Sequence, residues 1–269
     1  MKKSLLVCLL CILLLTACGT TEATEPSATS TAPTPVAETE IPTTAPTEET
    51  TIPTEPPVTE PAHSALYIPG VDVEDVILWF NEVSLSAEFV NSGNPSFLQK
   101  WAAPIRYMIH GEPTEADVAM LEGFAHWLNG VDGFPGISEA TEQFEANLNI
   151  YFCTQDELLW RLGDNFYGTD GGVTFWYNGD NQIYDAVICI RTDLNQYLRN
   201  SVILEELYNG LGPVQDTTLR EDSLIYAGYS EPQELTEIDR LILQLLYHPQ
   251  MKCGMNSAQC EDVIRKLYY

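Results

Sequence analysis

The chain has 269 residues, and its 12 basic and 39 acidic side chains give it a formal net charge of −27 at pH 7. A surface this acidic repels nucleic acid and anionic lipid head groups, so we expect neither as a partner. Apolar residues make up 45% of the sequence, which is enough for one sizeable hydrophobic core.

The N-terminus has the pattern of a bacterial export signal. A basic start precedes an apolar run over residues 5–15 that is too short to cross a bilayer as a helix. The run ends in Leu-Thr-Ala-Cys18, which resembles the lipobox of bacterial lipoproteins. The resemblance implies that residues 1–17 are removed and that Cys18 carries the lipid that anchors the protein to the outside of the cell membrane. The alternative is an ordinary cleaved signal peptide.

The next segment, residues 19–62, has the composition of a disordered linker. It contains 14 Thr, 9 Pro and 8 Glu among its 44 residues, with no aromatic residue, Lys or Arg. Such a segment cannot bury enough apolar surface to offset its chain entropy. We therefore interpret 18–62 as a lipidated cysteine followed by a stalk, and 63–269 as a single globular domain.

Helices and strands alternate along this domain. Thr114, Thr154 and Thr236 are each followed three residues later by an acidic residue, which predicts capped helix starts. Asn178-Gly179 between two apolar runs predicts a hairpin. The expected elements are a helix over 72–85, a strand over 104–110, a helix over 114–128, a strand over 147–152, a short helix from 154, strands over 173–177 and 183–190, a helix within 202–216, a helix over 236–247 and a short helix over 258–267. The fold class is α+β with a mixed sheet.

The helix within 202–216 has an unusual polar pattern. Its sequence, Glu205-Glu206-Leu-Tyr-Asn209-Gly-Leu-Gly212-Pro-Val-Gln215, resembles the His-Glu-x-x-His-x-x-Gly-x-x-His helix of metzincin peptidases. In that motif the histidines bind zinc and the glutamate deprotonates the bound water. Here the glutamate and the glycine remain, whereas Glu205, Asn209 and Gln215 replace the three histidines.

Downstream segments extend the resemblance to roughly residues 100–250. Ser-Leu-Ile225-Tyr resembles the methionine turn of matrix-type metzincins, with Ile225 in place of methionine, and 235–247 is similar to their closing helix. The chain also resembles an uncharacterised family of exported bacterial proteins, which share Glu-Glu-Leu-x-x-x-Leu-Gly and a later Leu-Tyr…Gly-Met segment. Together these resemblances imply a metzincin-like domain with an active-site-type helix and a closing C-terminal helix.

The replaced histidines argue against catalysis. Carboxamides are poor zinc ligands, and without zinc Glu206 has no activated water on which to act as a base. We therefore expect no metal or other cofactor, and a catalytically inactive cleft that binds a peptide or a cell-envelope ligand. Its candidate residues are Glu205, Glu206, Asn209, Gln215 and Ile225.

Two other functions are compatible with the sequence. The protein could be an active metal-dependent peptidase with atypical ligands, in which case Glu206 would be catalytic. It could also be a structural or interaction protein displayed on a stalk, with no cleft function. Separately, Glu205 and Glu206 could simply lie on a solvated helix face. If a carboxylate is buried, Arg191 and Arg199 are candidate partners. His110 and His126 fit structural roles better than ligand roles.

Four cysteines, Cys153, Cys189, Cys253 and Cys260, follow the signal and the lipobox. Outside the cytosol disulfides persist, and the short spacing makes Cys253 and Cys260 a candidate pair. Four cysteines allow three pairings, and free buried thiols are equally compatible with the sequence.

Overall fold

The computed structural model describes residues 64–85, 97–228 and 231–269. The predicted signal peptide (1–17), the lipidation site Cys18 and the predicted linker up to residue 62 lie outside the described residues. The described residues belong to the globular part of the chain.

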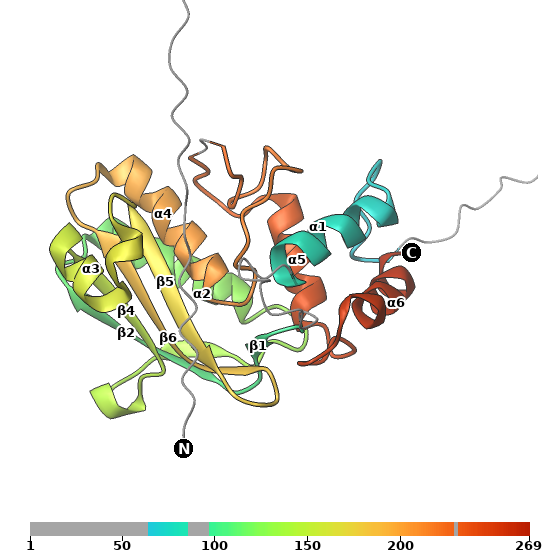
Figure 1. Cartoon of the computed structure of the whole chain (residues 1–269), viewed down its shortest axis with the longest axis horizontal. Coiled ribbons are helices and arrows are strands. Elements are labelled where there is room, and N and C mark those ends of the chain that lie inside the picture. The colour runs from blue at the N-terminus through green and yellow to red at the C-terminus, as the bar shows by residue number, and fades with distance from the viewer. Residues whose placement is uncertain (1–63, 86–96, 229–230) are drawn as a thin grey trace, which may run out of the picture. The chain divides into compact units, whose positions relative to one another are not determined.

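The domain is built on a mixed, mostly parallel sheet of six strands (Figure 1). The strands β3, β2, β4 and β6 lie side by side and parallel, and the short β1 is parallel to the start of β6. The strand β5 is antiparallel to β6 and, within the described residues, pairs with no other strand. The strand bounds are β1 Lys100–Trp101, β2 Ile105–Gly111, β3 Ile137–Glu139, β4 Leu148–Cys153, β5 Gly171–Tyr177 and β6 Gln182–Arg191.

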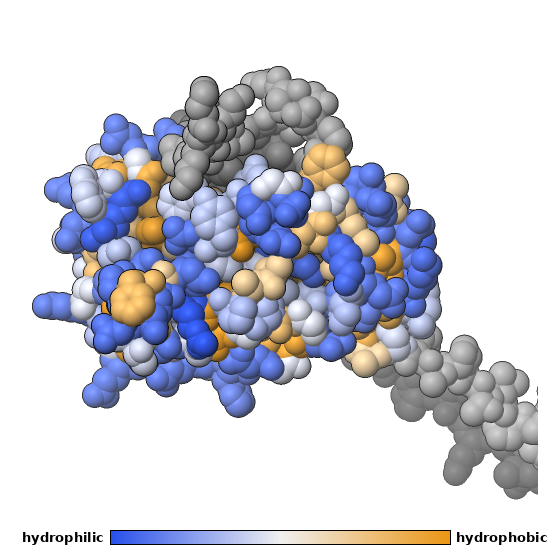
Figure 2. Space-filling view, turned by 90° about the horizontal axis from the view of Figure 1, so that it is seen from below, coloured by the Kyte–Doolittle hydropathy of each residue, from blue (hydrophilic) through white to orange (hydrophobic). Residues whose placement is uncertain are grey.

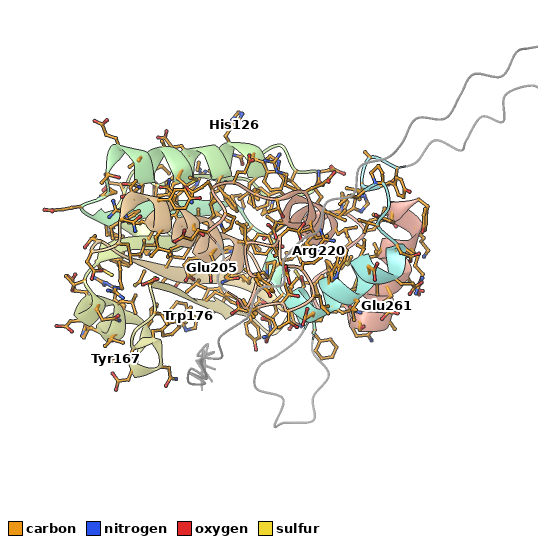
Figure 3. All side chains as sticks on the ribbon, turned by 90° about the horizontal axis from the view of Figure 1, so that it is seen from above. His126, Tyr167, Trp176, Glu205, Arg220 and Glu261 are labelled. Carbon is orange, nitrogen blue, oxygen red and sulfur yellow. The ribbon has the colours of Figure 1, made fainter. Side chains whose placement is uncertain are left out.

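Helices cover both faces of this sheet. The layers can be seen in Figure 3 from four labelled residues, which are His126 on α2, Glu205 on α4, Trp176 on β5 of the sheet and Tyr167 beside η2. The remaining helices α1, α5 and α6 lie together at one side of the sheet (Figure 1). The helix bounds are α1 Val73–Leu85, α2 Glu115–Leu128, α3 Gln155–Leu162, α4 Gln196–Asn209, α5 Glu237–Tyr247 and α6 Ser257–Tyr268, with 3-10 turns η1 Gln143–Glu145 and η2 Asp164–Phe166.

The predicted α+β class and the predicted helices are confirmed. At Thr114, Thr154 and Thr236 the side chain accepts a hydrogen bond from the backbone N–H three residues later. The acidic side chain at that later position accepts one from the backbone N–H of the threonine. Each of the three helices therefore begins where the sequence predicts. The strands β1 and β3 were not predicted, because two or three residues are too few to display an alternating pattern.

The predicted hairpin joins β5 and β6, but its turn is longer than Asn178-Gly179. The backbone N–H of Asn178 donates to the carbonyl of Gln182, so the three residues 179–181 form the loop. The positive φ of +59° falls at Asn181. The Asn178 side chain holds this loop by accepting from the backbone N–H groups of Asp180 and Gln182.

Two glycines let helices approach the start of β5 from opposite faces. A Cβ at Gly171 would lie 2.6 Å from Val202 Cγ1 of α4, and one at Gly172 would lie 2.5 Å from the Phe166 ring. Both distances are far below van der Waals contact. The edge strand can therefore lie directly against α4.

The C-terminal helix closes the domain against its beginning. The backbone carbonyl of Tyr268 accepts from Ser64 Oγ, and Arg265 pairs with Glu74. Among the helices that the structure describes, none is both long enough and apolar enough to cross a bilayer. Figure 2 shows a face on which hydrophilic residues predominate and apolar residues occur in small groups.

Asp239 at the start of α5 fixes the turn that precedes it. Its buried carboxylate accepts from Ser223 Oγ at 2.7 Å, from the Leu224 N–H at 3.0 Å and from Thr236 Oγ1 at 2.7 Å. Removal of this acceptor leaves several buried donors unpaired, each at a cost of about 1–3 kcal/mol.

We therefore expect Asp239→Ala to lower the free energy of unfolding by about 2–4 kcal/mol, measured by urea denaturation. Glu237→Ala is the matched control, because Glu237 is exposed in the same helical turn. Equal losses in the two variants would contradict a structural role for the buried network.

Candidate functional site

The helix α4 presents the polar residues of the predicted motif on one side. It begins at the N-cap Asn195, whose side chain accepts from the Leu198 N–H at 3.0 Å, and it ends at Asn209. Residues one turn apart on a helix lie on the same face, so Glu205 and Asn209 are neighbours, as are Glu206 and Asn209. The structure thus brings together three of the five predicted cleft residues.

Two of these side chains are buried with oxygen atoms that no donor satisfies. Glu206 is 6% exposed and Asn209 is 2% exposed, whereas Glu205 is partly exposed. Within the described residues neither Glu206 Oε2 nor Asn209 Oδ1 has a hydrogen-bond partner. An unsatisfied buried acceptor costs about 1–3 kcal/mol, so two adjacent ones are an expensive arrangement.

The glutamate side chain lies over the edge strand. A Cβ at Gly171 would be 2.9 Å from Glu206 Oε1. Gly171 follows Asp170 directly, and the charge of Asp170 acts on Glu205. The carboxylates of α4 are therefore next to the first residues of β5.

Burial and neighbouring negative charges keep both glutamates from ionising. Burial, followed by the charges of Asp216 and Asp170, raises the pKa of Glu205 to about 8. Burial also raises the pKa of Glu206 well above its usual value, and Glu205 and Asp216 raise it further. Within the described part of the chain, the causes that act on these two groups are burial and negative charge, so near neutral pH the pair holds protons that exposed glutamates would lose.

The expected arginine partners pair elsewhere. Arg199 donates from Nε to Asp117 Oδ1 of α2 at 2.9 Å, and its other nitrogens donate to Thr192, Leu194 and Gln196. Arg191 pairs with Asp193 at 2.7 Å and with Asp170 at 3.4 Å. The expectation that either arginine pairs with a buried glutamate of α4 is therefore wrong.

Of the other two predicted cleft residues, Ile225 does not belong to the polar group. It is 1% exposed and packs in the hydrophobic core, within a turn closed by a hydrogen bond from the Tyr226 N–H to the Ser223 carbonyl. Gln215 is partly exposed, and its side-chain nitrogen donates at 3.4 Å to the backbone carbonyl of Asp216. The turn predicted around Ile225 is present, but its apolar side chain does not face a cleft.

Gly212, the glycine of the motif, turns the chain after α4. Gly212 has a φ of +135°, and a Cβ there would lie 2.7 Å from the carbonyl oxygen of Gln99. The chain can therefore turn closely over the segment that leads into β1 and bring 214–217 back beside α1. There the backbone N–H of Val214 donates to Val83.

The donors at this site do not suit zinc. The motif positions supply one carboxyl and two carboxamides, and structural and catalytic zinc sites use imidazole, thiolate or carboxylate. Within the described residues no three His, Cys, Asp or Glu side chains are close enough to hold a metal ion. The residues at these positions therefore do not fit a zinc ion.

The histidines and cysteines lie in other surroundings. His110 stacks on Tyr151 at 4.3 Å with its Nε2 2.9 Å from Asn149 Oδ1, and His126 is exposed on α2. All four cysteines of the described part are free thiols, so the candidate disulfide between Cys253 and Cys260 is not formed. Cys253 Sγ instead donates to the Lys100 carbonyl at 3.7 Å.

The family described as "Protein of unknown function (DUF2927)" matches residues 74–266. This chain belongs to that family. The DUF2927 match covers the sheet and extends from α1 to α6, so it includes the polar face of α4. A search of curated proteins gave no match to the chain.

Sequence reasoning missed two acidic residues that act on the polar group in this DUF2927 domain. Asp216 stands one position after Gln215, which the motif spacing singles out, and its charge acts on both Glu205 and Glu206. An acidic residue beside a motif position was the only available signal. Asp170 was also missed, because it is far from α4 in the sequence and only folding brings the start of β5 close to that helix.

The shifted pKa values predict a pH-dependent stability. A carboxyl group whose folded pKa is raised reduces stability as the pH rises above its unfolded value near 4.5, and the loss is complete above the folded pKa. We expect Glu206→Gln to leave the melting temperature nearly unchanged at pH 4. At pH 8 it should raise that temperature by several degrees, since each pKa unit corresponds to about 1.4 kcal/mol.

Thermal unfolding followed by circular dichroism at both pH values measures the effect. Glu122→Gln is the control, because Glu122 is an exposed helical glutamate on α2. A Glu206→Gln variant with the same change in melting temperature at pH 4 and at pH 8 would show that Glu206 ionises normally.

Proposed function

We propose that this protein is an extracellular lipoprotein whose domain retains the scaffold of a metallopeptidase, lacks its catalytic zinc and binds a peptide or another cell-envelope ligand. The observation that carries the proposal is the polar face of α4. Glu205 and Asn209 occupy the positions where a metzincin would have two of its zinc-binding histidines, beside an edge strand.

The lack of catalysis follows from the chemistry of that face. A hydrolytic base must be ionised and must have a polarised water molecule within reach. Glu206 has a pKa well above its usual value, and its neighbours are acceptors that cannot bind zinc. The domain therefore has neither the base nor the Lewis acid of a peptidase.

The arrangement around α4 supports the metzincin-like scaffold. A strand antiparallel to the rest of the sheet lies against the helix, a glycine with positive φ follows it, and the turn at 223–226 and the helix α5 come next. These features occur in the order that the resemblance implies.

Binding would use the edge strand β5. Within the described residues this strand pairs only with β6, and its first five residues are buried while Trp176 and Tyr177 are partly exposed. In this proposal an extended peptide adds to its other edge as a further strand. Such a peptide would run past the start of β5, next to Glu205 and Asp170. Strand addition provides backbone hydrogen bonds with little sequence preference, which suits a surface receptor.

The burial of Glu206 and Asn209 is the observation that favours the alternative of a stalk-displayed interaction protein without a cleft. Glu205 and Asp216, however, are partly exposed and give solvent access to the same group. Measurements of zinc content, peptide binding and membrane attachment distinguish the candidates.

Lack of catalysis predicts that the full chain in detergent, equilibrated with zinc chloride and desalted, retains far less than one zinc per molecule. It also predicts that a quenched fluorescent peptide library is cleaved no faster by the wild type than by Glu206→Gln. One zinc per chain that EDTA removes, together with cleavage that Glu206→Gln abolishes, would establish an active peptidase instead.

Strand addition predicts that a dye-labelled decapeptide of alternating threonine and alanine with a central lysine binds the full chain saturably in fluorescence anisotropy. The same peptide with N-methylated backbone amides should bind at least about 10-fold more weakly, because methylation removes ladder hydrogen bonds. No binding of any decapeptide would contradict the peptide-binding proposal.

The lipid anchor predicts that the wild type sediments with membranes and that Cys18→Ser releases the protein into the soluble fraction. Mass spectrometry should find acyl chains on Cys18 at the mature N-terminus. Cys253→Ser is the matched control and should remain with the membranes. An unacylated Cys18, or a Cys18→Ser protein that still sediments, would exclude anchoring at this residue.

A further inference from the structure

Four acidic or amide side chains lie around the C-terminal half of α4. We call Glu205, Glu206, Asn209 and Asp216 the acidic cluster. Its glutamates and asparagine share one helix face, and Asp216 follows the turn after α4 closely enough for its charge to act on both glutamates. Glu205 and Asp216 are partly exposed, so the acidic cluster can be reached from solvent.

The buried part of the cluster points to a ligand independently of its charge. Asn209 is neutral and only 2% exposed, and its Oδ1 has no partner in the described part of the chain. The same is true of Glu206 Oε2. Buried acceptors are almost always satisfied, so two adjacent exceptions call for a donor from outside the domain.

The two arginines that the sequence offered as partners for these glutamates bind other groups. Arg199 lies on the same helix two turns before Glu206, about 10 Å along the axis, but its guanidinium is held by Asp117 and by backbone carbonyls. Arg191, the partner of Asp170, is also held by Asp193. Neither arginine donates to the acidic cluster.

The geometry favours an ammonium group over a metal ion. Within the described residues no three acidic, histidine or cysteine side chains converge at metal distance. An alkylammonium group carries one compact charge and three N–H donors, which can reach acceptors spread over a wider site. Its three N–H groups match Glu206 Oε2 and Asn209 Oδ1, which have no partner within the described residues, and one carboxylate oxygen of Glu205.

We infer that the acidic cluster receives the primary ammonium group of a bound peptide, as at the end of a lysine-type side chain. This inference rests on the proposed peptide-binding function and specifies its ligand. The cluster lies against the start of β5, where a side chain of a peptide added to that edge would reach it. An ammonium group there would supply the donors that Glu206 Oε2 and Asn209 Oδ1 lack.

The test compares three dye-labelled decapeptides on the full chain in detergent by fluorescence anisotropy. All have alternating threonine and alanine, and their central residue is lysine, Nε-acetyllysine or norleucine. We expect the lysine peptide to bind at least about 10-fold more tightly than either neutral peptide, since an ammonium group loses its charge on acetylation. This comparison needs no variant of the protein.

Variants then locate the preference. Glu205→Gln and Asp216→Asn keep the size of each side chain but cannot form the carboxylate that an ammonium group would pair with in the complex, so each should reduce the preference for lysine several-fold. Glu122→Gln, which removes an exposed charge on α2, should leave the preference intact and thus corrects for the change in net charge. Thermal unfolding of each variant verifies that it is folded.

The outcomes separate this inference from the proposal beneath it. Equal affinity for the three peptides would overturn the ammonium site while leaving peptide binding in place. Absence of binding by all three would overturn both. A lysine preference that survives Glu205→Gln and Asp216→Asn would place the ammonium group elsewhere and overturn the assignment. Displacement of the lysine peptide by stoichiometric calcium or zinc would assign the cluster to a metal ion instead.

Discussion

The candidate site depends on one buried ion pair, between Arg199 of α4 and Asp117 of α2. Asp117 also belongs to the capping box of α2, so this carboxylate fixes a helix start and ties two helices together. Burial alone would raise its pKa, but hydrogen bonds from Thr114, Gln196 and Arg199 lower it overall. Arg199, which lies on the same helix as Glu206, is therefore bound to Asp117 and does not pair with that glutamate. Breaking such a pair typically destabilises a protein by about 3–5 kcal/mol, so Arg199 is not free to move to the glutamates.

The excess of negative and acceptor groups on α4 follows from the pairing of Arg199 with Asp117. Two carboxyl groups and an amide oxygen share a largely buried face, with further negative charge from Asp216 and Asp170. A domain that only needed to be stable would place apolar residues there, because buried acceptors without donors reduce stability. Polar groups kept in an unfavourable arrangement are typical of sites that interact with something else. Positive charge brought by a ligand would relieve the arrangement, which links the missing zinc chemistry to a binding role.

Local patterns in the sequence predicted much of the fold. The three Thr-x-x-Asp/Glu boxes work within four residues, so tertiary context does not alter them, and the hairpin signal at Asn178 was sufficient despite the longer turn. By contrast, β1 and β3 exist only because neighbouring strands supply their partners. The motif spacing correctly placed Glu205, Glu206 and Asn209 together. It could not show that Ile225 is a core residue, that Arg199 is bound to Asp117, or that Asp216 rather than Gln215 acts on the glutamates, because each of these facts depends on packing between distant segments.

In the described part of the chain no cation pairs with the glutamates of α4, and a pH titration of the side-chain carboxyl carbons by ¹³C NMR tests this most directly. Glu205→Gln and Glu206→Gln assign the two resonances. We predict that both groups titrate far above the usual range for glutamate, with Glu205 near pH 8 and Glu206 well above its normal value. Normal titration of both, at a pKa of about 4 to 5, would contradict the account, because it would mean that a donor or a cation already satisfies them.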